Sequence, residues 1–176
     1  MAKDLKTELN FRLIWKHTDQ PDSTLSSLSP KIVDSNTMEL LDSLTDGTAQ
    51  PDVARVLWHD IRVLAGSANE TFDLAGGLVD VFGETLTFTI IRSFCVINRN
   101  LSTDADGILE VGAGSNPWDS WLGDGTDLVK VGPGGALFIW NPSTAGFAVT
   151  AGTADILKVA NTGAGDVEYQ IAFIGE

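Results

Sequence analysis

Short apolar runs that alternate with clusters of turn-forming residues recur along most of this chain, and they constrain its fold more than any other feature. From residue 127 onward they read DLVKVG, GALFIWN, FAVTAG, DILKVAN and VEYQIAFIG, with Gly, Thr, Asn, Asp or Pro between them. Runs at intervals of about 8–12 residues, with no helical pattern between them, are typical of antiparallel sandwiches and barrels. The sequence therefore predicts an all-β protein, a single antiparallel β-sandwich that is jelly-roll-like.

The predicted sandwich occupies residues 51–176, and residues 1–50 are expected to form an extended N-terminal arm. In the arm, Phe11, Leu13 and Trp15 lie at every second position, which is the period of a half-buried strand. The polar stretch after them predicts a long loop, and TMELLDSLTDG predicts one or two helical turns that end at a glycine. Further on, GLVDVFG is expected to form a single helical turn.

The longest strand candidate is ETLTFTIIRSFCVINRN, and it does not alternate cleanly between apolar and polar residues. Its apolar run extends from Ile90 to Val96. Such a run indicates either a strand that is covered on both faces or a strand with a bulge.

The charge of the chain excludes several classes of partner. The formal net charge is −13 and no cluster of Lys and Arg is present, whereas binding to nucleic acid needs such clusters to neutralise phosphates. No segment approaches the roughly 20 apolar residues that span a membrane, and the N-terminus lacks the apolar stretch of a secretory signal. We therefore expect no nucleic-acid or membrane partner, and synthesis in a host cytoplasm.

Residue types that carry chemistry are few and scattered. Cys95 is the single cysteine and lies within a strand candidate, which favours a structural role. The Asp-rich segments 102–107 and 122–127 have the composition of turns, although a calcium site there stays open. His17 and His59 belong to no catalytic or metal-binding motif. We expect no enzyme activity, no metal site and no cofactor.

Tryptophan side chains are the best candidates for contacts with other molecules. Trp118 and Trp121 lie in a loop rich in Gly and Asp, where they could pack on the protein's own sheet, fill a protein interface or stack on sugar rings. Trp140 lies beside another turn. These three residues, together with Phe11, Leu13 and Trp15 of the arm, form the predicted interface set.

Two long segments carry a resemblance to a known group of proteins. They extend from LTDGTAQPDVARVLWHD to FCVINRN and from WLGDGTDLVKVGPGG to the final VEYQIAFIGE. The shared features are DLAGGL-DVFG, the VGPGG turn, TAGFAVTAGTADILKVAN and the last strand. In these features the chain resembles structural proteins of tailed-bacteriophage and prophage virions. The resemblance implies a virion structural role, and we expect that role to be on the capsid.

The leading hypothesis is a capsid decoration protein that stabilises the head shell, with the major capsid protein as its partner and the capsid surface as its location. Self-association as a homotrimer is expected, because shells offer three-fold positions where a cyclic oligomer contacts several subunits. The alternative is a head-fibre or tail-tip module that recognises host glycans through Trp118 and Trp121.

Overall fold

A computed structural model of the chain describes residues 5–19, 32–101, 103 and 106–176. The described residues form strands and turns without a helix, in antiparallel sheets that pack together as a β-sandwich. The predicted fold class, all-β with a sandwich, is confirmed.

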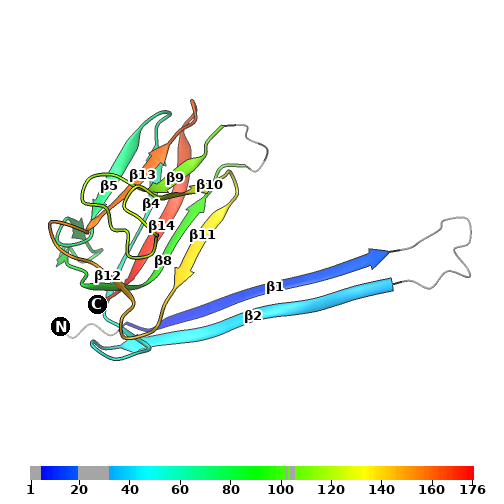
Figure 1. Cartoon of the computed structure of the whole chain (residues 1–176), viewed down its shortest axis with the longest axis horizontal. Coiled ribbons are helices and arrows are strands. Elements are labelled where there is room, and N and C mark those ends of the chain that lie inside the picture. Colours follow the sequence, from blue (N-terminus) through cyan, green and yellow to red (C-terminus); the bar gives the residue numbers. More distant parts are fainter. Residues whose placement is uncertain (1–4, 20–31, 102, 104–105) are drawn as a thin grey trace, which may run out of the picture. The chain divides into compact units, whose positions relative to one another are not determined.

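The sandwich consists of two sheets that face each other (Figure 1). In one sheet, the β13 sheet, the strand order is β10–β9–β13–β5; in the other, the β8 sheet, it is β11–β8–β14–β4, with β12 also paired to β8. The strands of the β13 sheet are β5 (Asn69–Asp73), β9 (Leu109–Gly112), β10 (Leu128–Val131) and β13 (Ile156–Asn161). Those of the β8 sheet are β4 (Val56–Leu64), β8 (Ile90–Asn98), β11 (Ala136–Trp140), β12 (Phe147–Ala148) and β14 (Val167–Gly175).

The pairing pattern of the eight long strands is that of a jelly roll. Strand β4 pairs with β14, β5 with β13, β8 with β11 and β9 with β10, and every one of these pairs is antiparallel. The first of the eight strands thus pairs with the last and the second with the next to last, which folds a long double ribbon into two stacked sheets.

Aromatic side chains fill the space between the two sheets. Phe94 from β8 and Phe173 from β14 stack with ring centroids 5.2 Å apart and nearly parallel planes. Phe72 from β5 packs against Phe173 at 6.1 Å, which joins the β13 sheet to the β8 sheet. Burial of such large side chains gives a sandwich its main stabilisation.

The longest strand candidate of the sequence forms β8. Of the two alternatives predicted for it, coverage on both faces or a bulge, the bulge is observed. The register between β8 and β14 shifts between Ile174 and Gly175, which is a bulge. At Gly175 a Cβ atom would lie 2.0 Å from the carbonyl oxygen of Ile90, so the close approach of the two backbones requires glycine there.

The predicted helical turn in GLVDVFG is wrong, because this segment belongs to a small hairpin of β6 (Leu78–Val79) and β7 (Thr85–Leu86). The Asp80 carboxylate accepts hydrogen bonds from the backbone N–H groups of Phe82 and Glu84, both at 2.9 Å. An aspartate that binds its own turn in this way competes with a helix for the same backbone groups.

Residues 7–44 form a separate compact unit, a hairpin of β1 (Thr7–Asp19) and β2 (Ile32–Asp46). The two strands pair antiparallel in one unbroken register from Thr7 with Leu44 to Asp19 with Ile32. The helical turn predicted for TMELLDSLTDG is therefore wrong, because pairing with β1 outweighs a weak local preference for helix. Part of the predicted loop, residues 20–31, lies outside the described residues.

The unit that contains the sandwich begins earlier than the predicted boundary after residue 50. Thr45 and Asp46 pair in parallel with β3 (Val53–Ala54), and the backbone N–H of Ala49 donates to the Glu176 carboxylate. The segment from Thr45 therefore belongs with the sandwich, and the arm ends at Leu44.

Candidate interaction surfaces

The outer side of the β8 sheet carries mostly apolar side chains on its four long strands, with His59 and Gln170 as polar members, and we call it the apolar face. Alternation along each strand directs these side chains away from the core. The apolar face consists of Leu57, His59, Ile61 and Val63 on β4, Gln170, Ala172 and Ile174 on β14, Cys95 and Ile97 on β8, and Ala136, Phe138 and Trp140 on β11.

Several side chains of the apolar face are exposed to an extent unusual for their type. Val63 is 65% exposed and Ile61 56%, while Leu57, Ile97 and Phe138 lie between 36% and 38%. Single exposed apolar residues are normal, but a contiguous patch of them marks a contact site or an aggregation hazard.

The apolar face is hollowed at its centre. The register places Cys95 beside Ala172, and Ala172 beside His59, so that two small side chains lie next to each other in this row. The neighbouring row contains the larger Ile97 and Ile61. Together these residues line a depression of about 410 Å³. Burial raises the pKa of the Cys95 thiol, so the thiol stays protonated, as the predicted structural role requires.

One edge of the apolar face is aromatic. Phe138 and Trp140 on β11 stack with ring centroids 6.4 Å apart and planes inclined by 24°. Trp140, a predicted interface residue, is half-buried. Alternation along β11 places it on the apolar face with Phe138. Tryptophan and phenylalanine are enriched at the centres of protein interfaces.

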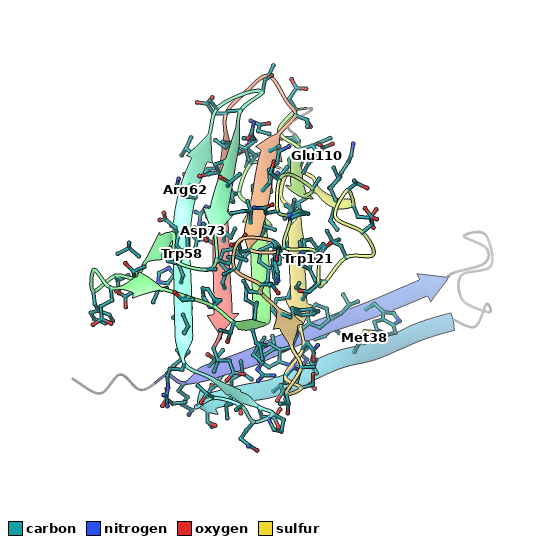
Figure 2. The ribbon with its side chains drawn as sticks, turned by 60° about the vertical axis from the view of Figure 1, so that its left-hand side comes forward. Met38, Trp58, Arg62, Asp73, Glu110 and Trp121 are labelled. Carbon is teal, nitrogen blue, oxygen red and sulfur yellow. The ribbon has the colours of Figure 1, made fainter. Side chains whose placement is uncertain are left out.

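The outer side of the β13 sheet contains charged and polar side chains together with Leu128, Ile156 and Ala160, and we call it the polar face. Lys130 on β10 pairs with Glu110 on β9 at 3.1 Å. On β5, Asn69, Thr71 and Asp73 are exposed. Asp73 and Glu110 can be followed on their strands in Figure 2. This face has the charged and hydrogen-bonding groups that an outward side of a sheet normally shows.

The structure shows which of three alternatives holds for Trp118: it packs on the protein's own core. Its side chain is 1% exposed, its ring contacts Phe94 edge-on at 5.6 Å, and its indole N–H donates to the carbonyl of Ala148 at 3.0 Å. The prediction that Trp118 serves an interface is therefore wrong for this structure, because it leaves no surface for a protein or a sugar.

Trp121, labelled in Figure 2, is half-buried. Its ring centroid lies 5.9 Å from that of Trp118, and its ring also packs on Phe94. Its indole N–H donates to the carbonyl of Trp118 at 3.0 Å. The Trp121 ring thus packs on Trp118 and Phe94.

The arm also has an apolar face, which we call the arm face. Cross-strand pairs place Phe11 beside Leu40 and Leu13 beside Met38, and all four side chains are exposed. Met38 can be seen on β2 in Figure 2. Trp15 shares this face by alternation. The predicted interface residues of the arm thus lie together, joined by two residues of β2 that sequence reasoning assigned to a helix.

A charged network joins the edges of the two sheets. The Glu70 carboxylate on β5 accepts a hydrogen bond from the Tyr169 hydroxyl at 2.6 Å and pairs with the Arg62 guanidinium at 2.5 Å. Arg62 also contacts Asp60 at 3.1 Å. Burial, and then the bond to Glu70, raise the pKa of Tyr169 far above its ordinary value, while the bond to Glu70 raises the pKa of Arg62. Both Glu70 oxygens are occupied, which suits a structural clamp.

A second ion pair is buried. The Arg92 guanidinium donates to the Glu176 carboxylate at 2.8 Å and to the carbonyl of Gln50 at 3.1 Å. The side chains are 0% and 6% exposed. This pair attaches the segment before β3 to the end of β14, and removal of one partner would leave a buried charge.

Within the residues that the structure describes, the Asp-rich segment 122–127 forms a turn stabilised by its own aspartate. Asp124 accepts hydrogen bonds from the backbone N–H and the hydroxyl of Thr126, and the first of these lowers the pKa of its carboxyl. The predicted calcium alternative at 102–107 falls partly on residues outside the described ranges. Among residues that the structure describes, no group of three or more His, Cys, Asp or Glu side chains is placed to hold a metal ion.

No protein-family model matches the chain, and no curated protein matches it in sequence. Within the described residues, no helix is long and apolar enough to cross a membrane.

Sequence reasoning missed most of the apolar face. Ile61, Val63, Ile97 and Phe138 were not among the predicted interface residues. The signal was present in part, since the apolar run of β8 indicated a strand covered on both faces. The sequence did not reveal the strand register, which places β8 and the apolar residues of β4, β14 and β11 in one sheet.

Proposed function

We propose that this protein is a structural component of a tailed-bacteriophage virion, a decoration protein that binds the major capsid protein and stabilises the head shell as a homotrimer. The observation on which this proposal depends is the arm. A two-stranded hairpin with an exposed apolar face is at most marginally stable alone in water. An arm that becomes fully ordered on a large neighbouring surface suits a protein that clamps a shell.

The chemistry of the arm face supports attachment to protein. Its central pairs are Phe11 with Leu40 and Leu13 with Met38, which are apolar and bear no charge. The free edges of a hairpin can also add a strand to an exposed sheet of a partner. Both modes give extended contacts with another polypeptide.

The rest of the protein fits the same role. The sandwich has a dense aromatic core and a polar face that suits an outward, solvated position. The alternative, glycan recognition, is not proposed further, because Trp118 is buried and Trp121 packs beside it.

The test uses undecorated heads and two full-length variants, each with one substitution, at adjacent residues of β1. Leu13→Asp places a carboxylate on the arm face, whereas Ile14→Asp places it on the opposite side of the same strand. Ile14 is also exposed, at 60%, so the two changes are matched in burial and chemistry. We expect Leu13→Asp to weaken head binding by about tenfold or more, and Ile14→Asp to weaken it far less.

Co-sedimentation with heads and a heat-stability assay of the decorated particles provide the readouts. Equal binding by both variants would exclude the arm face as the attachment site. No binding of the wild-type chain to heads would exclude the decoration role itself.

A further inference from the structure

We propose that the apolar face is the surface through which copies of this chain bind one another. The inference names the surface for the self-association proposed above and rests on that part of the proposal. Its partner is a second copy of this chain, whose own apolar face packs against the first. Because both copies use the same surface, the contact is two-fold and gives a dimer in place of the trimer.

The first argument is the pattern of the strands themselves. An antiparallel strand with one side in water alternates apolar and polar residues, whereas a strand covered on both sides is apolar throughout. In β8 the outward Cys95 and Ile97 are as apolar as the inward Phe94 and Val96, and Ser93 is a polar member of the outward row. The strand has the composition of one covered twice, yet Ile97 is exposed.

The second argument is charge. The chain has 24 acidic and 11 basic residues, so two copies repel each other wherever carboxylates meet. The apolar face contains no Asp, Glu, Lys or Arg. The nearest acidic side chain on the outward side of β14 is Glu168, and it is neutralised by Arg99 at 2.6 Å. Two acidic molecules can therefore approach here without setting like charges together.

The third argument is area and shape. Four strands about 4.8 Å apart and about seven residues long span roughly 450 Å². This is about half of the 800 Å² that each partner contributes to a standard interface. Sheets stack face to face about 10 Å apart in sandwiches, so two such faces can pack in the same way. A contact of this size is smaller than a standard interface, so we expect a reversible complex rather than an obligate one.

The experiment compares two full-length variants on matched positions of the two sheets. Ile61→Lys changes the apolar face, and Thr71→Lys changes the polar face; both residues are β-branched, exposed and on the edge strands β4 and β5. Each substitution lowers the net negative charge by the same amount. General repulsion therefore cannot explain a difference between them.

Analytical ultracentrifugation from about 1 to 200 µM gives the dissociation constants. We expect wild type and Thr71→Lys to associate equally, and Ile61→Lys to have a dissociation constant at least about 30-fold higher, with an unchanged circular dichroism spectrum. Higher salt should strengthen the association of the wild type, because it screens the repulsion between copies.

Cys95 provides a second measurement that needs no substitution, since it is the single cysteine and lies within the apolar face. Its alkylation by a maleimide should slow as the wild-type protein is concentrated, and should not slow in Ile61→Lys. A wild-type chain that stays monomeric at 200 µM, or equal association of both variants, would overturn the inference. So would an alkylation rate that does not change with protein concentration, because self-association would then leave Cys95 as accessible as it is in the monomer.

These outcomes separate the inference from the proposed function. A monomeric wild-type chain that still binds heads would retain the decoration role and reject the apolar face as a self-association surface. A chain that associates through this face but does not bind heads would retain the self-association surface and reject the decoration role.

Discussion

The two sheets of the sandwich share one core but present opposite chemistry to the outside. On the polar face, Lys130 and Glu110 form an ion pair and β5 exposes Asn69, Thr71 and Asp73. On the apolar face the corresponding positions are Ile61, Ile97 and Phe138. Since both faces are the outward sides of antiparallel sheets, the fold alone does not explain the difference. The self-association proposed above would place a second contact layer over the β8 sheet and would account for the difference.

The largest expected change in the free energy of unfolding comes from a comparison of one inner and one outer phenylalanine, which tests whether the apolar face is part of the monomer's core. Phe173→Ala, on the inner side of β14, should lower the free energy of unfolding by about 3–5 kcal/mol, because Phe173 is fully buried among aromatic rings. Phe138→Ala, on the outer side, should cost about 1 kcal/mol or less in dilute protein. Urea unfolding at low micromolar concentration measures both.

A loss above about 2 kcal/mol for Phe138→Ala in the monomer would break the comparison, since the apolar face would then be a structural layer of the single chain. In concentrated protein the same variant should lose more stability than in dilute protein, because association stabilises the folded state by mass action.

The next effect concerns the edge where the two sheets are clamped by charge. Tyr169→Phe should lower stability by about 1.5–3 kcal/mol near neutral pH, because the hydroxyl donates to the Glu70 carboxylate. The raised pKa of Tyr169 in the folded state also sets a pH dependence. The unfolded chain loses this proton near pH 10. Stability is therefore full below that pH and falls as the pH rises above it.

Tyr169 is the single tyrosine, so its ultraviolet difference spectrum reports its ionisation directly. The wild-type protein should show ionisation only on unfolding, and Tyr169→Phe should lose stability less steeply above pH 10. Titration of the folded wild type near pH 10 would contradict the clamp.

The smallest effect compares two minor truncations, one on each face. Cys95→Ala should cost about 1 kcal/mol, since the half-buried thiol is lost from the hollow of the apolar face. Thr71→Ala on the polar face should stay within about 0.5 kcal/mol. Thermal unfolding measures both, and head binding by Cys95→Ala should remain as in the wild type. A folded Cys95→Ala protein that no longer enters particles would contradict the structural role of this thiol.

The fold was predictable because its signals are local. Runs such as DILKVAN and VEYQIAFIG alternate with turn residues at a spacing that only sandwiches and barrels show. The wrong prediction of a helical turn in β2 also has a physical reason. In β2 the local sequence TMELLDSLTDG has a weak helical period, and the pairing that overrides it comes from β1, on the other side of residues 20–31.

The surfaces were predictable only in part. Phe11, Leu13 and Trp15 were assigned to one face from alternation alone, and the structure places Leu40 and Met38 beside them. For Trp118 the sequence left three alternatives, because a loop has no period that fixes where its side chains point. The apolar face combines residues of four strands, and no local pattern reveals which strands become neighbours.

The pairing of β4 with β14 has a consequence for the order of events during synthesis. These strands lie about 100 residues apart, and their contact bridges nearly the whole sandwich. The pairing of β5 with β13 is similarly distant. Domains dominated by such remote contacts fold in milliseconds to seconds, slowly for their size. On the ribosome, β4 emerges early and waits for β14, so the sandwich can close only after the last strand has been made.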